Sequence, residues 1–317
     1  MAKLIILIGL PGSGKSYYAK LIQRADADNT GVVIHSSDAI REELFGDPNS
    51  QENNSLVFEV MHRRAQADLR KGHTVVFDAT NITRKARRGA INLASKDDTV
   101  EGHIVWAPVE VCRERDAQRE RTVGVDVIDK MIRRWQSPWY DEGFHKLRIY
   151  CSDYSFDHIL YVARTVNAMH IPHDNPHHTL GVYEHCDMAY QKMLELLKDK
   201  PGHQFLGNEF SCLPAATYWH DIGKPYTKFY KKKPDSVELD LSRAYYYDHH
   251  CVGGYLAYGL FIPKDTMTTK QQEDACFISW LIATHMDPFF DTKYYRALCP
   301  RLRTCIDLLH EADLQAH

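Results

Sequence analysis

A glycine-rich stretch near the start of the chain has the residue types needed to hold a nucleoside triphosphate. Residues 9–16 read Gly-Leu-Pro-Gly-Ser-Gly-Lys-Ser and fit the pattern G-x-x-x-x-G-K-[ST]. Glycines let backbone N–H groups point at phosphate oxygens, where a Cβ would crowd the ligand. Lys15 can reach the β- and γ-phosphates, and the Ser16 hydroxyl can hold Mg²⁺. The stretch therefore predicts a site for ATP, or another nucleoside triphosphate, with Mg²⁺.

A second set of reactive side chains is rich in histidine and lies in the other half of the chain. Six of the eighteen histidines precede residue 165 and twelve follow it. Imidazole and carboxylate groups are ligands for Mn, Fe, Co, Ni or Zn. Adjacent His220 and Asp221 can each hold one of two ions, with Asp221 as a bridge, and two ions can clamp a phosphate and generate a hydroxide. The candidate metal ligands are His185, His220, Asp221, His249, His285 and Asp313.

The elements that position the first set follow a strand-helix alternation up to about residue 165. Helical periodicity runs from residue 53 to 71 and from 84 to 95. The apolar or β-branched runs that predict strands are Leu4–Ile8, Val32–His35, Thr74–Phe77 and His103–Trp106. Such alternation predicts a parallel sheet flanked by helices, with ligands at the carboxyl ends of the strands. After a short linker near 161–171, the pattern is helical to the end of the chain.

Carboxylates follow two of the expected strands. Asp38, with Arg41 one helical turn further on, comes after the second strand, and Asp78 comes after the third. A carboxylate facing the phosphate loop could hold Mg²⁺ or take a proton from an attacking hydroxyl. Asp38 alone would be read as a helix N-cap. The matching placement of Asp38 and Asp78 favours a site.

The stretch from Arg113 to Arg121 carries four arginines followed by a loop. Guanidinium groups at such a place could close as a lid on the γ-phosphate. Several of these arginines could equally lie on a solvated helix with i,i+4 ion pairs.

These features resemble the kinase domain of phage-type polynucleotide 5′-kinases over about residues 1–165. Residues 134–138 and 141–144 recur in related P-loop kinases. The resemblance implies that Asp38 is the general base for an acceptor 5′-hydroxyl and that Arg41 contacts the acceptor phosphate. Arg115 and Arg119 would stabilise the transferred phosphoryl group, although Arg121 could replace either, and Ser37 stands where such a kinase has arginine. The implied cofactor-binding set is Gly9, Pro11, Gly12, Ser13, Gly14, Lys15, Ser16 and Asp78.

The order of histidines and aspartates in residues 168–317 resembles the HD-domain phosphohydrolases, which have an all-α fold. The resemblance implies that the core ligands are His185, His220, Asp221 and Asp313. His249 and His285 would complete a second metal position, and Lys224 would contact the substrate phosphate. His250 stands where many relatives have glutamate, so the number of ions stays open.

The run Lys-Phe-Tyr-Lys-Lys-Lys at 228–233 interleaves basic and aromatic residues. Such a run suits a nucleic-acid strand, but it also suits a solvated loop. Both interpretations stay open.

The composition of the chain limits the classes of protein to which it could belong. A chain of 317 residues with 44% hydrophobic residues is expected to form two soluble domains, and a net charge of −3 gives no general argument for nucleic-acid binding. We expect no signal segment and no membrane partner, since no apolar run approaches ~20 residues. Eight cysteines without a C-x-x-C pair indicate free thiols and a cytoplasmic location.

Together the two resemblances favour an enzyme that heals broken nucleic-acid ends. The kinase would phosphorylate a 5′-hydroxyl, and the second domain would remove a 3′-phosphate or a 2′,3′-cyclic phosphate, so that a ligase could join the ends. RNA is the favoured substrate, and DNA is an alternative. Two other interpretations are a kinase of a small metabolite with a nucleotide-hydrolysing second domain, and a nucleotide-gated sensor.

Overall fold

The computed structural model describes residues 1–26, 31–47, 53–120, 122–175, 179–198, 209–234, 236–262 and 267–316. The chain forms two compact units, of which the first contains Met1–Met131 and Pro138–Ser155. The second contains Ile132–Ser137 and Phe156–His317. The first unit therefore ends at Ser155, before the boundary that we expected at residue 165. The segment Ile132–Ser137 lies between the two parts of the first unit in the sequence but belongs to the second unit.

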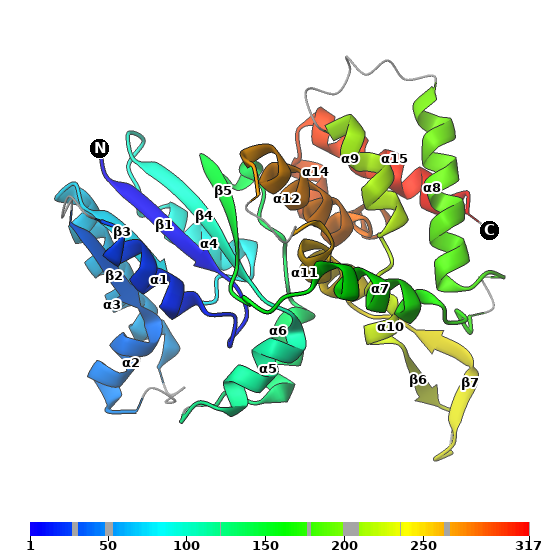
Figure 1. Ribbon diagram of the computed structural model, residues 1–317, viewed down its shortest axis with the longest axis horizontal. Coiled ribbons are helices and arrows are strands. Elements are labelled where there is room, and N and C mark those ends of the chain that lie inside the picture. Colours follow the sequence, from blue (N-terminus) through cyan, green and yellow to red (C-terminus); the bar gives the residue numbers. More distant parts are fainter. Residues whose placement is uncertain are drawn as a thin grey trace. The chain divides into compact units, whose positions relative to one another are not determined.

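The first unit is built on a five-stranded parallel sheet in the order β2-β3-β1-β4-β5 (Figure 1). The expected parallel sheet with flanking helices is confirmed, and the sequence missed only its last strand, an edge strand. The strands are β1 (Lys3–Ile8), β2 (Val32–Ser36), β3 (Thr74–Asp78), β4 (Thr99–Trp106) and β5 (Lys146–Cys151). Central β1 is almost wholly buried, as expected for a strand covered on both faces.

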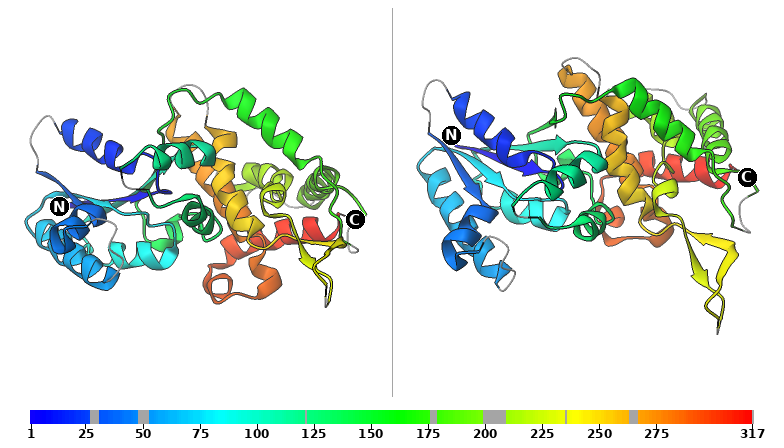
Figure 2. Two further views of the ribbon diagram at one scale, coloured as in Figure 1. Left: turned by 90° about the horizontal axis from the view of Figure 1, so that it is seen from below. Right: turned by 60° about the horizontal axis from the view of Figure 1, so that its bottom comes forward.

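Helices cover both faces of this sheet. Figure 2 (left) shows α1 on one face and α3 and α4 on the other, as right-handed crossovers require for this strand order. The helical elements of the unit are α1 (Lys15–Arg24), α2 (Ser37–Phe45), α3 (Asn54–Arg70), α4 (Arg84–Ile91), α5 (Val109–Ala117), α6 (Val125–Ile132, whose last residue belongs to the second unit) and the 3₁₀ turn η1 (Tyr140–Glu142).

Strand register brings the expected site residues to one edge of the sheet. Ser36 at the end of β2 pairs with Asp78 at the end of β3. β1 lies next to β3 and runs parallel to it, and the glycine-rich loop follows Ile8. The loop, Asp38 and Asp78 therefore all follow the carboxyl ends of neighbouring strands.

Two glycines of the loop have a left-handed backbone, with φ +78° at Gly12 and +89° at Gly14. A Cβ on Gly12 would lie 2.1 Å from the Cys112 carbonyl oxygen, a rigid backbone atom. Gly12 is therefore required both by its conformation and by the closeness of α5.

A buried ion pair ties α4 to η1. The Arg87 side chain is fully buried and donates from Nε to Glu142 Oε2 (2.7 Å) and from Nη2 to Oε1 (2.6 Å). Its third contact is the Asn81 carbonyl oxygen at 3.1 Å. Removing one partner of such a pair leaves an uncompensated charge in the interior.

Glu142→Gln is expected to destabilise the first unit by roughly 3–5 kcal/mol, because the Arg87 guanidinium loses its counter-charge while still buried. Chemical denaturation followed by intrinsic fluorescence measures this change. Glu43→Gln is the matched control, since Glu43 also forms a bidentate ion pair, with Arg64, but this pair lies on the surface. That variant is expected to unfold close to the wild type; equal effects of the two substitutions would contradict the prediction.

The second unit is mainly helical, and its core is formed by α11 and α12, which are apolar on nearly all sides. The helices are α7 (His158–Met169), α8 (Val182–Lys198), α9 (Glu209–Tyr218), α10 (Lys224–Thr227), α11 (His249–Phe261), α12 (Thr269–Thr284), α13 (Asp287–Phe290), α14 (Lys293–Ala297) and α15 (Pro300–Leu314). No helix among the described residues has the length and apolar character needed to span a membrane.

Two expectations for this part of the chain were wrong. The expected linker near 161–171 is largely helix α7, whose N-terminus is capped by Asp157 accepting from the Leu160 N–H at 3.0 Å. The region is also not all-α, because β6 (Phe229–Lys232) and β7 (Leu239–Tyr245) form an antiparallel hairpin. The two lysines of β6 follow an aromatic pair without alternation, and the leucines of β7 alternate with polar residues only over Leu239–Ser242 and are exposed, so neither strand has the pattern of a half-buried strand.

The segment Ile132–Ser137 is packed inside the second unit. The Trp135 ring is fully buried and meets the Tyr255 and Tyr258 rings of α11 edge-on. Ser137 Oγ lies 2.7 Å from Ser279 Oγ of α12. A Cβ on Gly254 would lie 2.7 Å from the Ala283 Cβ and 2.9 Å from Ser137 Oγ, so glycine is needed for this close approach.

Candidate functional site

The glycine-rich loop brings a lysine, a hydroxyl and a carboxylate together. Lys15 Nζ, at the first turn of α1, donates to the Leu10 carbonyl at 2.7 Å, and the Ser16 hydroxyl donates to Asp78 Oδ2 at 2.9 Å. Ser13 Oγ is buried in the loop without a hydrogen-bond partner. Hydroxyl and carboxylate oxygens are the ligands that Mg²⁺ prefers, and an orphaned buried hydroxyl is expected where a ligand completes the site.

Burial dominates the electrostatics of the loop. It lowers the pKa of the Lys15 ammonium, an effect that the Asp78 carboxylate opposes. It also raises the pKa of Asp78, against the charge of Lys15. Two buried groups of opposite charge thus face each other, and a triphosphate with Mg²⁺ would supply counter-charges to both.

Asp38 is held at the loop by a buried arginine. Arg41 Nη1 donates to Asp38 Oδ1 at 3.1 Å, and Nη2 donates to Asn54 Oδ1 at 2.8 Å. The Asp38 side chain is 55% exposed, whereas that of Arg41 is 7% exposed. Asp38 is close enough to influence the pKa values of both Lys15 and Asp78. This carboxylate can therefore be reached by an acceptor from solvent while facing the phosphate loop.

Of the arginines expected to form a lid, Arg115 and Arg119 lie near the glycine-rich loop. Arg115 donates to Ser152 Oγ (2.8 Å) and to the Ser152 carbonyl (3.0 Å), beside Gly14. Arg119 is exposed after the end of α5, and its charge acts on Lys15 and Asp78. The Asp116 carboxylate accepts from the backbone N–H groups of Val123 and Gly124, each at 3.0 Å, and ties the following loop to α5. Arg121 lies outside the described residues.

The fold and this site of the first unit fit a nucleotide-binding P-loop domain of the kinase type. Residues 4–138 match a family model described as an AAA domain.

Named relatives share parts of the chain. L-seryl-tRNA(Sec) kinase of Methanococcus maripaludis is 29% identical over 143 residues, which are 43% of this chain and 53% of the relative. Transcription factor bHLH140 of Arabidopsis thaliana is 24% identical over 233 residues, 68% of this chain and 22% of that protein. The chain thus spans about half the length of the first relative and about a fifth of the second. Among solved structures, a chain of the Pnkp1/Rnl/Hen1 RNA repair complex has 24% identity and a TM-score of 0.37, over 41% of this chain and 42% of that one.

The six candidate metal ligands of the second unit converge on one centre. They come from α8, the turn after α9, the start of α11, the end of α12 and α15. Asp221 belongs to two groups of potential ligand atoms, each within 4.8 Å: one with His185 and His220, the other with His249 and His285. Asp313 Oδ1 lies 2.9 Å from His185 Nε2 and 3.3 Å from His220 Nε2.

Backbone carbonyls fix the orientation of all four imidazoles. Since a carbonyl only accepts, each Nδ1 carries a hydrogen, so in the neutral ring it is Nε2 that offers a lone pair to a cation at the centre. The Nδ1 atoms of His185, His220, His249 and His285 donate to the carbonyl oxygens of Ala316, Thr217, Tyr246 and Ile282 at 2.7–2.9 Å.

This orientation leaves polar atoms unmatched at the centre. His249 Nε2 and His285 Nε2 lie 3.1 Å apart, and two neutral rings of this tautomer place lone pair against lone pair. His220 Nε2 and Asp221 Oδ2 are buried without a hydrogen-bond partner, although the Lys224 ammonium lies 2.5 Å from Asp221 Oδ2 in poor hydrogen-bond geometry. A cation between these atoms would satisfy them, so the residues fit a metal centre.

The charge states of the clustered side chains also fit a metal centre. Burial opposes ionisation of Asp221, but the Lys224 and His220 charges outweigh it and hold its pKa well below the usual range. Burial, together with the charges of His249 and His220, lowers the pKa of His285 well below normal. Burial lowers the pKa of His220 as well, yet Asp221 and Asp313 raise it well above normal. A metal ion would displace the proton from this ring, because only the neutral ring is a ligand.

The sequence missed a residue that positions Lys224. His173 is buried and donates from Nδ1 to the Leu180 carbonyl at 2.8 Å, so its Nε2 accepts from Lys224 Nζ at 3.0 Å. The Tyr246 hydroxyl donates to the His173 carbonyl. Lys224 is thereby held between Asp221 and His173. A lone histidine in a loop gave no periodic signal that could have identified it.

His250, which replaces an expected glutamate, is half-buried, and its ring is near those of His249 and His285. It belongs to neither ligand group among the described residues.

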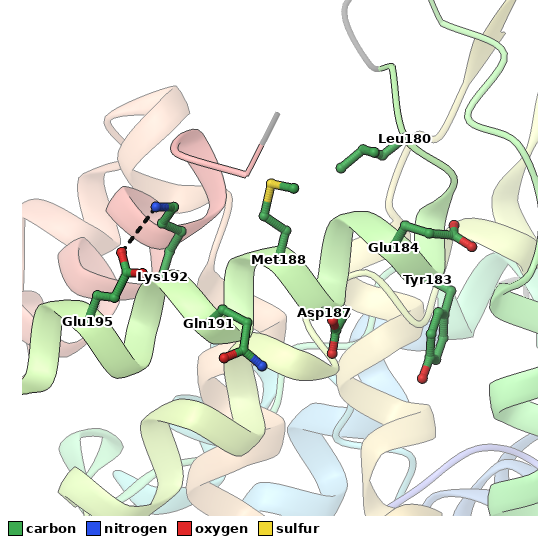
Figure 3. Close-up of a pocket in the computed structure, with 8 residues that line it drawn as sticks. All are labelled: Leu180, Tyr183, Glu184, Asp187, Met188, Gln191, Lys192 and Glu195. Carbon is green, nitrogen blue, oxygen red and sulfur yellow. Dashed lines mark hydrogen bonds and ion pairs between the residues drawn. The ribbon is translucent and has the colours of Figure 1, made fainter.

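A pocket of about 570 Å³ lies elsewhere in this unit, along α8 (Figure 3). Its lining combines apolar side chains such as Leu180 and Met188 with charged ones, including the Lys192–Glu195 ion pair at 3.0 Å. None of the candidate site residues lines it.

Proposed function

We propose that the chain heals broken nucleic-acid ends with two activities, an ATP-dependent 5′-hydroxyl kinase and a metal-dependent 3′-end phosphohydrolase of the HD type. The observation that carries the proposal is the presence, in one chain, of a P-loop with an accessible carboxylate and a buried cluster of six potential metal ligands beside a lysine. Either feature alone fits many enzymes.

In the kinase reaction, Asp38 takes the proton of the acceptor hydroxyl as its oxygen attacks the γ-phosphorus, and ADP leaves. Lys15 neutralises charge on the β- and γ-phosphates, while Ser16 and Asp78 are placed to hold Mg²⁺. Arg41 orients Asp38 and can contact an acceptor phosphate. Arg115 and Arg119 stabilise the charge of the transferred group.

In the hydrolase reaction, His185, His220, Asp221 and Asp313 would hold one ion and Asp221, His249 and His285 a second. Such ions polarise a phosphoryl group and activate water as a nucleophile. The four Nδ1–H···O=C bonds fix the ligand rings. Lys224, held by His173, is placed to bind a substrate phosphate oxygen.

RNA is our preferred substrate class. The Methanococcus maripaludis relative is named as a kinase of seryl-tRNA, and this supports an acceptor hydroxyl carried by RNA. The products of the two reactions, a 5′-phosphate and a free 3′-hydroxyl, are the ends that a ligase joins, so a ligase is the expected cooperating partner.

The test is an RNA with a 5′-hydroxyl and a 2′,3′-cyclic phosphate, followed at both ends by gel electrophoresis. After chelation, 5′-phosphorylation is expected to return with ATP and Mg²⁺ alone. Removal of the cyclic phosphate is expected to return only with a transition metal from the series Mn, Fe, Co, Ni and Zn, because nitrogen ligands favour those ions over Mg²⁺. Transfer of phosphate to sugars or nucleosides but to no oligonucleotide would contradict the proposal.

A further inference from the structure

The β6–β7 hairpin is inserted between two residues of the metal cluster region. β6 begins after α10, which starts at Lys224, and β7 ends shortly before His249. In Figures 1 and 2 the hairpin extends away from the helices of its own unit. An isolated two-stranded hairpin is only marginally stable, so the β6–β7 hairpin requires contacts with the rest of its unit.

The inner side of the hairpin is anchored on Asp174, next to His173. Lys228 Nζ donates to Asp174 Oδ2 at 2.8 Å, and the Tyr230 hydroxyl donates to the same atom. The Ala244 N–H donates to the Asp174 carbonyl at 2.6 Å. Because His173 holds Lys224, the hairpin and the cluster are fixed to the same short segment.

The outer side carries aromatic rings and cations, and we call it the aromatic–basic face, consisting of Phe229, Lys231, Arg243, Tyr245 and Tyr247. The three rings lie 5.3–5.7 Å apart between centroids. Lys231 Nζ lies 4.1 Å from the Tyr245 ring centroid, and the Arg243 guanidinium lies 5.5 Å from it.

The cations of this face are exposed, and Arg243 lies near enough to Asp240 for its charge to act on that carboxylate. Within the described residues, no carboxylate forms an ion pair with Lys231 or Arg243. The hydrogen-bond partner of Lys231 is the Tyr247 hydroxyl at 2.9 Å. Tyr247 itself is 54% exposed. The Lys233–Glu238 ion pair at 3.0 Å, just beyond the ends of the two strands, supplies the hairpin with a cross-strand pair of opposite charges, and it does not involve Lys231 or Arg243.

Aromatic rings grouped beside exposed cations match one kind of partner. Nucleobases stack on aromatic side chains, and phosphates pair with lysine and arginine. We propose that the aromatic–basic face binds single-stranded nucleic acid and directs its 3′ end to the histidine cluster. The inference rests on the proposed hydrolase function for the second step only; the binding itself can be tested without catalysis.

The experiment compares wild-type protein with Lys231→Gln/Arg243→Gln, using fluorescein-labelled single strands of about 12 nucleotides, within the usual site size of single-strand binding modules. RNA and DNA strands are separate arms. Fluorescence anisotropy is expected to show binding weakened about tenfold in the variant. The slope of log affinity against log salt should fall in magnitude by about 1.4, since two phosphate contacts are lost at about 0.7 each.

The matched control is Lys270→Gln/Lys293→Gln, which removes two exposed cations from other helices of the same unit. It is expected to bind like the wild type. Hydrolysis of bis(p-nitrophenyl) phosphate, which is too small to reach the face, should be equal in all three proteins. For an oligonucleotide 2′,3′-cyclic phosphate, KM should rise in the hairpin variant while kcat stays near the wild-type value.

The outcomes separate the two proposals. No binding of either strand by wild-type protein, or equal binding by the hairpin variant and the wild type, would overturn the inference. Binding that depends on the hairpin without any hydrolysis by wild-type protein would support the face and count against the proposed hydrolase. Weakened binding confined to one arm would assign the face to RNA or to DNA.

Discussion

Lys15→Ala is expected to lower 5′-phosphorylation of an oligonucleotide by about a thousandfold, the scale of losing a charge that stabilises a phosphoryl-transfer transition state. The Lys15 side chain is half-buried beside the loop, and its hydrogen-bond acceptor, the Leu10 carbonyl, is a backbone group of that loop. Bound triphosphate can therefore compete for it without disrupting a tertiary contact. Transfer of radiolabelled γ-phosphate measures the loss.

Lys20→Ala is the matched control, because Lys20 is exposed on the same helix and its substitution should leave transfer unchanged. Asp38→Asn should lower kcat for transfer while nucleotide binding is retained, since its exposed carboxylate is the proposed general base. Cyclic-phosphate hydrolysis should persist in the Lys15 variant. Retained transfer in Lys15→Ala, or simultaneous loss of hydrolysis, would refute the assignment of transfer to this loop.

Asp221→Asn is expected to abolish metal retention and to lower hydrolysis at least about a hundredfold. The residue is shared by both ligand groups and is the partner of Lys224. The substitution keeps the shape of the side chain but removes the charge that balances the ammonium and attracts cations. Elemental analysis of protein purified without chelator and the rate of phosphodiester hydrolysis are the two measurements.

Asp187→Asn provides the matched change at an exposed position on α8 and should keep both metal and activity. His285→Gln removes one of the two facing Nε2 atoms and tests the second ligand group without touching Asp221. Kinase activity of each variant reports whether the remainder of the chain is folded. A full metal complement in Asp221→Asn would rule out the bridging role.

The first site was predictable because its parts are local in sequence. The glycine-rich loop and its lysine are consecutive in the sequence, and Asp78 ends a strand whose neighbour is fixed by sheet order. The histidine cluster is different, since its members are far apart and only their order indicated that they would meet. Their common orientation by backbone carbonyls had no sequence signal, and metal binding itself stays a prediction.

What escaped prediction depends on long-range packing. The contact of His173 with Lys224 joins residues 51 positions apart through loop backbone. Strand β6 has four residues with two adjacent lysines, and the leucines of β7 are exposed, so a buried apolar alternation did not reveal the hairpin. Helix α7 was read as a linker although Asp157 provides an N-cap signal at its start.

The packing of Trp135 inside the helical unit has a consequence for synthesis of the chain. The segment 132–137 emerges from the ribosome before its partners Tyr255, Tyr258 and Ser279 exist. The sheet can form as its strands appear, as N-terminal domains commonly do, but this segment must wait with a large apolar ring uncovered until α11 and α12 are made. The polypeptide also passes between the two units three times. A single proteolytic cut therefore cannot separate them into intact halves, and a fragment ending at residue 155 would carry an unpartnered tryptophan.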